Sequence, residues 1–215
     1  YHPNGKEILA VTRFGSTNQL HKIITPMGAR KQITFFEEPV NTASYEPTKG
    51  EYLVYSKDTG GNEFGQLYSL NLKTMESKLL TDGGRSQNGG VTWKKDGSGF
   101  YFTSTKRNGG DRDIYYMNPL KPEETQSVLE LKGGGWGIND ISDDNKKLLI
   151  TEYVSANDSY LYIYDLDTKK VEPITDRKEK GIVQLNASFG KNPDEIYYVT
   201  DRDNEFSRLA IFNLK

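Results

Sequence analysis

The chain has 215 residues and no cysteine, which excludes disulfides and thiolate chemistry. Its 28 basic and 30 acidic side chains give a net charge of −2, so no basic field exists to attract nucleic acid. No apolar run approaches the roughly 18 residues that a membrane-spanning helix requires. Tyrosine occurs 14 times, which favours β-strands, and a soluble protein of either the cytoplasm or the periplasm fits this composition.

One short pattern recurs along the chain: an aromatic or apolar anchor, a turn rich in Pro, Asp, Asn or Gly, and then a short apolar run. The anchors are, in chain order, Tyr1, Tyr45, Trp93, Ile141 and Phe189. Successive anchors lie 44, 48, 48 and 48 residues apart. A period in the forties with strand-like content is typical of propeller blades. We therefore predict an all-β fold, a β-propeller of four-stranded antiparallel blades.

The second and fourth copies illustrate the strands expected in each blade. The second copy predicts strands at residues 40–45, 51–56, 66–72 and 77–81. The fourth copy predicts strands at residues 137–141, 147–152, 160–166 and 171–175. The second strand of each blade is continuously apolar, which indicates that neighbouring blades cover both of its faces. The fourth strand is shorter and more polar, as an outer edge strand should be.

The whole chain is expected to form a single, partial propeller. Its blades are predicted at about residues 1–35, 38–82, 88–131, 136–176 and 183–215. The first copy begins at its anchor and the fifth ends in a third strand, so about five repeats are present. We expect these repeats to be an incomplete sector of a larger propeller of about seven blades.

The anchor turns resemble the Trp-Ser-Pro-Asp-Gly-Lys repeats of TolB-type and WD40-like propellers. The segment Asp58–Tyr68 is similar to an Asp-x-Gly-Gly-Asn-Glu stretch in propellers of the prolyl oligopeptidase family of serine peptidases. Further similar segments are 80–83, 88–93, 103–109 and 153–161. This resemblance implies an N-terminal propeller that admits small peptides and holds substrate termini. It also implies a following α/β-hydrolase domain that carries the catalytic Ser, Asp and His.

No catalytic machinery is expected in this chain. The Gly-x-Ser-x-Gly nucleophile elbow is absent, and Ser86 lacks the final glycine of that motif. His2 and His21 are the only histidines, and His21 lies in a predicted third strand, where a structural role is favoured. The hydrolase domain is therefore expected outside this chain, and the parent protein is expected to be a serine peptidase.

Charged loops join the second and third strands of the blades, at residues 58–64, 106–113, 155–159 and 201–207. By repeat symmetry these loops emerge on one face, where polar loops on a rigid scaffold usually carry function. The candidate contacts to a peptide or to the partner domain are Asn62, Glu63, Arg107, Asp111, Arg112, Asn157, Asp158, Arg202 and Glu205. The alternative is that each residue is a solvated hairpin tip.

Two further segments resemble ligand sites only in part. Residues 201–205 are rich in carboxylates but contain no glycine, so a calcium loop is not favoured. Residues 133–137 are rich in glycine but lack the Lys-Ser/Thr of a phosphate loop, and Trp136 is expected to pack between blades. We predict no metal and no cofactor. The expected partners are a peptide substrate and a C-terminal hydrolase domain; the alternative function is a TolB-like interaction or ligand-binding propeller with no enzyme attached.

Overall fold

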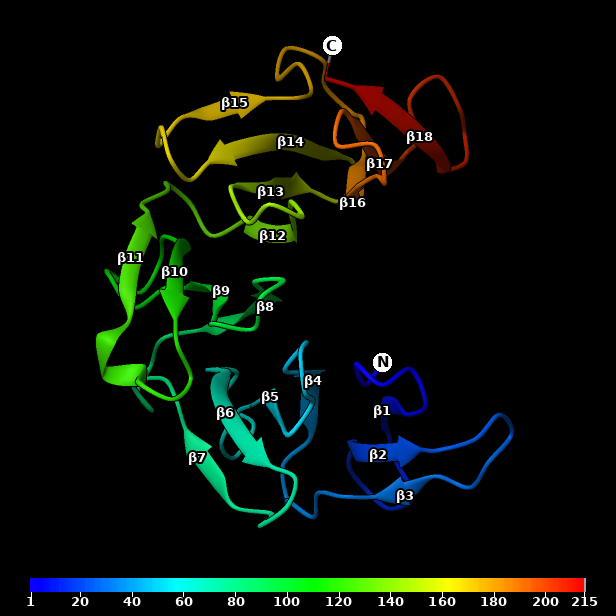
Figure 1. Cartoon of the computed structure of the whole chain (residues 1–215). Coiled ribbons are helices and arrows are strands. Elements are labelled where there is room, and N and C mark those ends of the chain that lie inside the picture. The colour runs from blue at the N-terminus through cyan, green and yellow to red at the C-terminus, as the bar shows by residue number, and fades with distance from the viewer. Residues whose placement is uncertain (215) are drawn as a thin grey trace. The chain divides into compact units, whose positions relative to one another are not determined.

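The computed structural model describes residues 1–214, which form five antiparallel sheets in which consecutive strands pair (Figure 1). The first sheet contains β1 (Ile8–Thr12), β2 (Gln19–Ile23) and β3 (Lys31–Gln32). The second contains β4 (Val40–Tyr45), β5 (Tyr52–Lys57), β6 (Gln66–Asn71) and β7 (Ser77–Leu79). The third contains β8 (Asn88–Trp93), β9 (Phe100–Ser104), β10 (Asp113–Met117) and β11 (Gln126–Leu129), with the 3-10 turn η1 (Pro122–Glu124) before β11.

The remaining sheets follow the same pattern. The fourth sheet contains β12 (Trp136–Ile141), β13 (Lys147–Ser155), β14 (Asp158–Asp165) and β15 (Val171–Pro173). The fifth contains β16 (Gln184–Phe189), β17 (Glu195–Thr200) and β18 (Arg208–Asn213). Two compact units divide the chain: unit 1 is Tyr1–Leu129 with three sheets, and unit 2 begins at Glu130 and holds the other two. The predicted all-β fold of antiparallel blades is confirmed.

The repeat register predicted from the anchors is confirmed in four of the five sheets. Tyr45, Trp93, Ile141 and Phe189 are the last residues of β4, β8, β12 and β16 respectively. Tyr1 is the exception, because it lies outside any strand and its side chain is 88% exposed. The first sheet starts with β1, the counterpart of a second strand, so no first strand ends at Tyr1.

The core of unit 1 lies between neighbouring blades. Every residue of β9 is buried, and so are the four central residues of β5, in agreement with the continuous apolar pattern. One cluster joins Val54, Leu67 and Leu80 of the second sheet to Trp93, Phe100, Phe102, Tyr115 and Met117 of the third. In contrast, β17 alternates between buried and half-buried residues, since only one of its faces is covered within the described chain.

The anchor turns need a left-handed residue, and glycine or asparagine supplies it. Gly5, Gly50, Gly97 and Asn145 have φ values of 70°, 66°, 71° and 59° at equivalent turns. A glycine has no Cβ to clash in this conformation, and asparagine tolerates it next best. Gly97 has a second constraint, because a Cβ there would lie 2.4 Å from Oε1 of Glu46 in the preceding blade.

A threonine after the fourth strand joins that strand's end to the third strand in three blades. The backbone N–H of Leu20 donates to Thr34 Oγ1 at 2.9 Å, and that of Leu67 donates to Thr81 Oγ1 at 3.0 Å. In unit 2, the backbone N–H of Leu161 donates to Thr175 Oγ1 at 2.9 Å. All three pairs are 14 residues apart, so this bond recurs with the repeat.

The hairpin of the fourth blade is tighter than predicted. β13 extends to Ser155 and β14 begins at Asp158, so only Ala156 and Asn157 form the turn. The expected loop at residues 155–159 is therefore wrong: strand pairing continues to the Ser155–Asp158 pair. The Trp136 ring lies 5.4 Å from that of Tyr162 in its own sheet, and its packing between blades stays a prediction.

Candidate functional site

In unit 1, two of the predicted loops border the same connecting segment. Residues 80–87, named here crossover A, link β7 to β8. The Arg85 guanidinium lies 4.9 Å from the ring centroid of Phe64, in the loop after β5. The Arg112 guanidinium donates to Gln87 Oε1 at 2.8 Å, from the loop after β9. The structure thus brings both loops of unit 1 against crossover A.

A buried glutamine fixes crossover A to the second sheet. Gln66 is 4% exposed, and its Nε2 donates to the Ser86 carbonyl at 2.9 Å. Its Oε1 accepts the Thr81 hydroxyl at 2.7 Å and the Gly83 N–H at 3.0 Å. A side chain with this many bonds leaves few ways for the segment to move. Gln19 forms an equivalent set of hydrogen bonds in the first blade, where its Oε1 accepts the Phe36 N–H at 3.1 Å.

Three of the predicted site residues form hydrogen bonds within their own loop or with crossover A. Arg107 donates to both carboxylate oxygens of Asp113, at 2.7 and 3.0 Å, and to Asp111 at 3.1 Å. The hydrogen bond with the buried Asp113 is the main cause that raises the pKa of Arg107 above its ordinary value. Burial lowers the pKa of Arg112, whose charge is held by Gln87. Arg107, Asp111 and Arg112 therefore shape the loop, and their charges are already engaged.

Asn62 and Glu63 form the exposed tip of the loop after β5. The Glu63 backbone has φ 62° and its N–H donates to Asp58 Oδ2 at 3.1 Å, which fixes the direction of the turn. Asn62 Oδ1 accepts the Phe64 N–H at 3.0 Å. Within residues 1–214, no donor bonds the carboxylate of Glu63. The backbone is therefore ordered while the carboxylate remains available to solvent or a ligand.

In unit 2, Arg202 and Asp158 are held by the segment between β15 and β16. Arg202 forms a two-point ion pair with Glu179, which raises the pKa of Arg202 through hydrogen bonding. Asp158 Oδ1 accepts the Tyr160 hydroxyl at 2.7 Å, and Tyr160 also donates to the Glu179 carbonyl at 3.2 Å. This network is the unit 2 counterpart of the bonds around crossover A.

Asn157 and Glu205 are the remaining predicted site residues, and both are exposed. Asn157 is the second residue of the β13–β14 turn, where its backbone N–H donates to Ser155 Oγ at 3.3 Å. Glu205 lies in the loop between β17 and β18, and nothing in the described part of the chain bonds its carboxylate. Glu63, Asn157 and Glu205 are therefore the predicted residues whose side chains stay open, each considered within its own unit.

Ser86 and His21 have structural partners. Ser86 donates its hydroxyl to Asp82, and its Oγ accepts from Asn88 Nδ2 at 3.0 Å. His21 is fully buried with Nδ1 at 3.0 Å from the Gln19 carbonyl. No serine–histidine pair exists among residues 1–214, and no group of three or more His, Cys, Asp or Glu side chains there is arranged as a metal site. The same residues include no helix able to cross a membrane.

The glycine-rich segment at residues 133–137 allows two backbone segments of the fourth blade to approach closely. A Cβ on Gly135 would lie 1.9 Å from the Tyr153 carbonyl oxygen, so only glycine permits this approach. Trp136 Nε1 donates to the Lys132 carbonyl at 2.9 Å. These contacts explain the glycine without a phosphate ligand.

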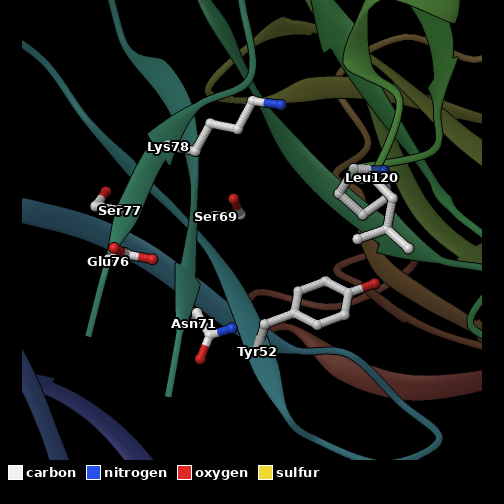
Figure 2. A pocket seen from close by; sticks show the side chains of 8 residues that line it. Tyr52, Ser69, Asn71, Glu76, Ser77, Lys78 and Leu120 are labelled. Atoms are coloured by element: carbon white, nitrogen blue, oxygen red, sulfur yellow. The ribbon is translucent and has the colours of Figure 1, made fainter. Parts of the chain in front are cut away.

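A hollow that the sequence did not predict lies beside the second sheet. It has a volume of about 470 Å³, and Figure 2 shows Lys78, Ser69, Asn71, Tyr52 and Leu120 around it. Tyr52 pairs with Asn71, and Ser69 with Lys78, so these side chains share one face of the sheet. The signal in the sequence was the polar pair Ser69 and Asn71 on one face of β6, where apolar blade contacts are expected.

A second hollow of about 440 Å³, named here the Asn88 hollow, shares Lys78 with the first. It borders Leu80, Phe102 and Met117, which are buried in the apolar cluster between the second and third sheets. Asn88 lines it from the start of β8. The two hollows follow the boundary between these two blades within unit 1.

Comparisons with solved structures agree on the fold. TolB from Acinetobacter baumannii matches with a TM-score of 0.71 and 23% identity, over 99% of this chain and 50% of that one. A structure from an analysis of two prolyl endopeptidases matches with a TM-score of 0.73 and 16% identity, over 97% of this chain and 33% of that one. A putative TolB from Agrobacterium tumefaciens gives a TM-score of 0.70 and 18% identity, over 100% of this chain and 75% of that one.

The first two of these structures are longer than this chain, which spans half or less of their length. A comparison with curated protein sequences finds no match. The family described as "Prolyl oligopeptidase, N-terminal beta-propeller domain" matches residues 40–215, which is most of the chain. The blades, the recurring anchor turns and this match agree with the resemblance seen in the segment Asp58–Tyr68. The chain belongs to the family of N-terminal β-propeller domains of prolyl oligopeptidases.

Proposed function

We propose that this chain is the non-catalytic propeller of a prolyl-oligopeptidase-like serine peptidase, where it gates and orients peptides for a hydrolase domain. Family membership over residues 40–215 is the observation that carries this proposal. Acyl transfer would then be supplied by the hydrolase domain of the parent protein.

The proposed peptide contacts are the open carboxylates and amides at the tips of the hairpins. Glu63 stands on a loop whose backbone is fixed by Asp58, so its carboxylate is presented without a competing partner in the described chain. A carboxylate of this kind suits the ammonium group of a peptide N-terminus. Asn62, Asn157 and Glu205 are assigned the same supporting role, and the arginines of these loops are assigned to loop structure instead.

The test is Glu63→Gln in the parent protein, assayed on short peptides with free and with acetylated N-termini. The hydrogen bond from Glu63 to the peptide ammonium would stabilise the ground state and the transition state equally. Its loss is therefore expected to raise KM by roughly tenfold and to leave kcat near its wild-type value. The effect is expected only for peptides with a free N-terminus. Glu51→Gln is the matched control, because Glu51 is also exposed and lies at the opposite end of β5. Unchanged KM for both peptides would refute the role of Glu63.

A second candidate function is a TolB-like interaction propeller with no enzyme attached. The observation that favours it is that two TolB structures align with 99% and 100% of this chain, including the first blade. The parent gene separates the two candidates. A nucleophile elbow of the Gly-x-Ser-x-Gly type within about 250 residues after the propeller supports the peptidase, and a coding sequence without one supports the interaction protein.

A further inference from the structure

The connection between the fourth and fifth blades is held differently from crossover A. Residues 174–183, named here crossover B, link β15 to β16 within unit 2 (Figure 1). One end is fixed by Thr175, which makes the recurring threonine bond, and the other by the Ile182 carbonyl, which accepts the Ser159 N–H at 3.2 Å. Between these ends, residues 176–181 are exposed or half-buried. The middle of crossover B therefore depends on its own contacts to the sheets.

Tyr160 replaces the glutamine that holds crossover A. Gln19, Gln66 and Tyr160 each directly precede the leucine whose N–H bonds the recurring threonine. The Gln66 amide fixes crossover A with both a donor and an acceptor. The Tyr160 hydroxyl has a single proton, shared between Asp158 Oδ1 at 2.7 Å and the Glu179 carbonyl at 3.2 Å. Crossover B therefore receives a weaker neutral bond than crossover A does.

A second neutral anchor is also missing from crossover B. Asn88 and Gln184 occupy equivalent positions, as the first residues of β8 and β16. Asn88 Nδ2 donates to the Ser86 carbonyl of crossover A at 3.3 Å. Gln184 is fully buried, and its side-chain amide has no hydrogen-bond partner among residues 1–214. Neither amide anchor of crossover A is thus reproduced in crossover B.

Charged groups hold crossover B on the fourth sheet instead. Arg177 Nη1 lies 2.7 Å from Glu152 Oε2, and Lys180 Nζ lies 3.9 Å from Asp158 Oδ2. The two carboxylate side chains are 12% and 15% exposed, whereas the two cations are 58% and 65% exposed. Both cations also lie over the Tyr160 ring, at 5.7 and 5.2 Å from its centroid. The cations are therefore open to solvent while they bind a sheltered surface.

A further ion pair holds crossover B on the fifth sheet. Glu179 pairs at two points with the guanidinium of Arg202, in the loop after β17. Both side chains are more than a third exposed. Crossover B is thus attached to both blades of unit 2 by charges that solvent reaches.

Exposed ion pairs respond to salt, whereas buried neutral hydrogen bonds do not. The Debye length falls from roughly 30 Å at 0.01 M salt to roughly 3 Å at 1 M, so dissolved ions weaken exposed pairs. Gln66 is uncharged and 4% exposed, so the bonds that it makes to crossover A are shielded from this effect. Salt is therefore expected to act selectively on crossover B.

We propose that crossover B is a salt-sensitive strap. Rising ionic strength releases residues 176–181 from the fourth and fifth sheets, while the ends of the strap and crossover A stay in place. Release opens the hydroxyl end of Tyr160, which is fully buried in the closed strap, to solvent. This inference goes beyond the proposed function and does not rest on it, because it uses none of the proposed peptide contacts.

The test is amide hydrogen exchange of the whole protein at about 10 mM and about 1 M NaCl, with both crossovers followed in the same sample. The reporters are the Glu179 N–H, which donates to the Asp176 carbonyl, and the Gly83 N–H, which donates to Gln66 Oε1. Exchange at Glu179 is expected to rise roughly tenfold relative to Gly83 as the salt concentration rises. An equal change at the two amides overturns the proposal.

Variants separate the ion pairs from the rest of the strap. Combining Arg177→Gln with Arg202→Gln is expected to give, at low salt, the fast exchange at Glu179 that the wild type shows at high salt. Lys178→Gln is the matched control, because it removes the same charge from crossover B and Lys178 has no ion-pair partner among the described residues. Its salt response should equal that of the wild type.

The amides of β13 and β14 show in the same samples whether the fourth sheet stays folded. If the double variant unfolds unit 2, the wild-type comparison of the two crossovers decides alone. A salt response that survives in the folded double variant, or that Lys178→Gln abolishes, overturns the assignment to these ion pairs.

Discussion

Replacing Gly97 by alanine tests whether neighbouring blades are joined through their anchor turns. Gly97 has φ 71°, so alanine there is less favourable by about 1–2 kcal/mol from backbone conformation alone. Its Cβ would also lie 2.4 Å from Glu46 Oε1 and 2.8 Å from Thr48 Cγ2. The Glu46 carboxylate cannot simply rotate away, because it accepts the backbone N–H groups of Thr48, Lys49 and Gly50 at 2.7, 2.9 and 3.1 Å.

Losing one of these charged hydrogen bonds adds about 1.5–3 kcal/mol, so Gly97→Ala is expected to destabilise unit 1 by about 3–4 kcal/mol. Gly5→Ala is the matched control, since Gly5 has φ 70° in the equivalent turn and a Cβ at Gly5 would meet nothing within 4 Å. That control should lose only the backbone contribution of about 1–2 kcal/mol. The assay is urea unfolding followed by Trp93 fluorescence in a Trp136→Phe background. Equal losses for the two variants would refute the contact with Glu46.

Three more substitutions test the polar groups that hold the turns and connections. Burial raises the pKa of Glu46, but the hydrogen bonds that its carboxylate accepts outweigh burial and lower the folded pKa below the ordinary 4.5. The contribution of Glu46 to the stability of the fold is therefore complete above pH 4.5 and is lost as pH falls through the folded pKa. Glu46→Gln should therefore lower stability by about 2 kcal/mol at pH 7 and flatten the acid limb of a stability–pH curve; an unchanged limb contradicts this. Gln66→Ala leaves several buried partners unbonded and should cost about 3 kcal/mol in urea unfolding, whereas a loss under about 1 kcal/mol would show that crossover A needs no such side chain. Tyr160→Phe removes the hydroxyl that bonds Asp158 and the Glu179 carbonyl, and should destabilise unit 2 by about 1–2 kcal/mol as reported by Trp136; an equal effect on unit 1 would contradict a local role.

The blades are predictable from the sequence because their signals are local and repeated. An anchor such as Trp93, a left-handed glycine such as Gly97 and the apolar run of β9 follow one another within a dozen residues. Asn145 takes the place of glycine in the fourth turn, and its φ of 59° agrees with that substitution. The β13–β14 hairpin is not predictable in this way, because polar residues that are typical of a loop continue the strand pairing.

The site is less predictable, because its residues meet through distant contacts. Arg107 and Glu63 look alike in sequence, as charged residues in a loop, yet Arg107 is bound to the buried Asp113 and Glu63 is open. Whether such a charged residue is paired or open depends on whether a buried carboxylate lies beside it. No local sequence pattern identifies Asp113 as buried. The hydrogen bonds of Asn88 are not predictable for the same reason, since its partners Gly65 and Gln66 lie more than 20 residues away.

The contacts between anchor turns limit how repeats can be exchanged by recombination or design. The residue after the anchor in one repeat faces the left-handed glycine of the next: His2 faces Gly50, and Glu46 faces Gly97, each at 2.4 Å from a Cβ built on the glycine. Each complementary pair is therefore divided between two repeats. A blade transplanted from another propeller must bring a glycine that fits the turn before it and a side chain that fits the glycine after it. Grafts that cut within the anchor turn would separate both pairs, whereas grafts that keep neighbouring turns together would inherit the match.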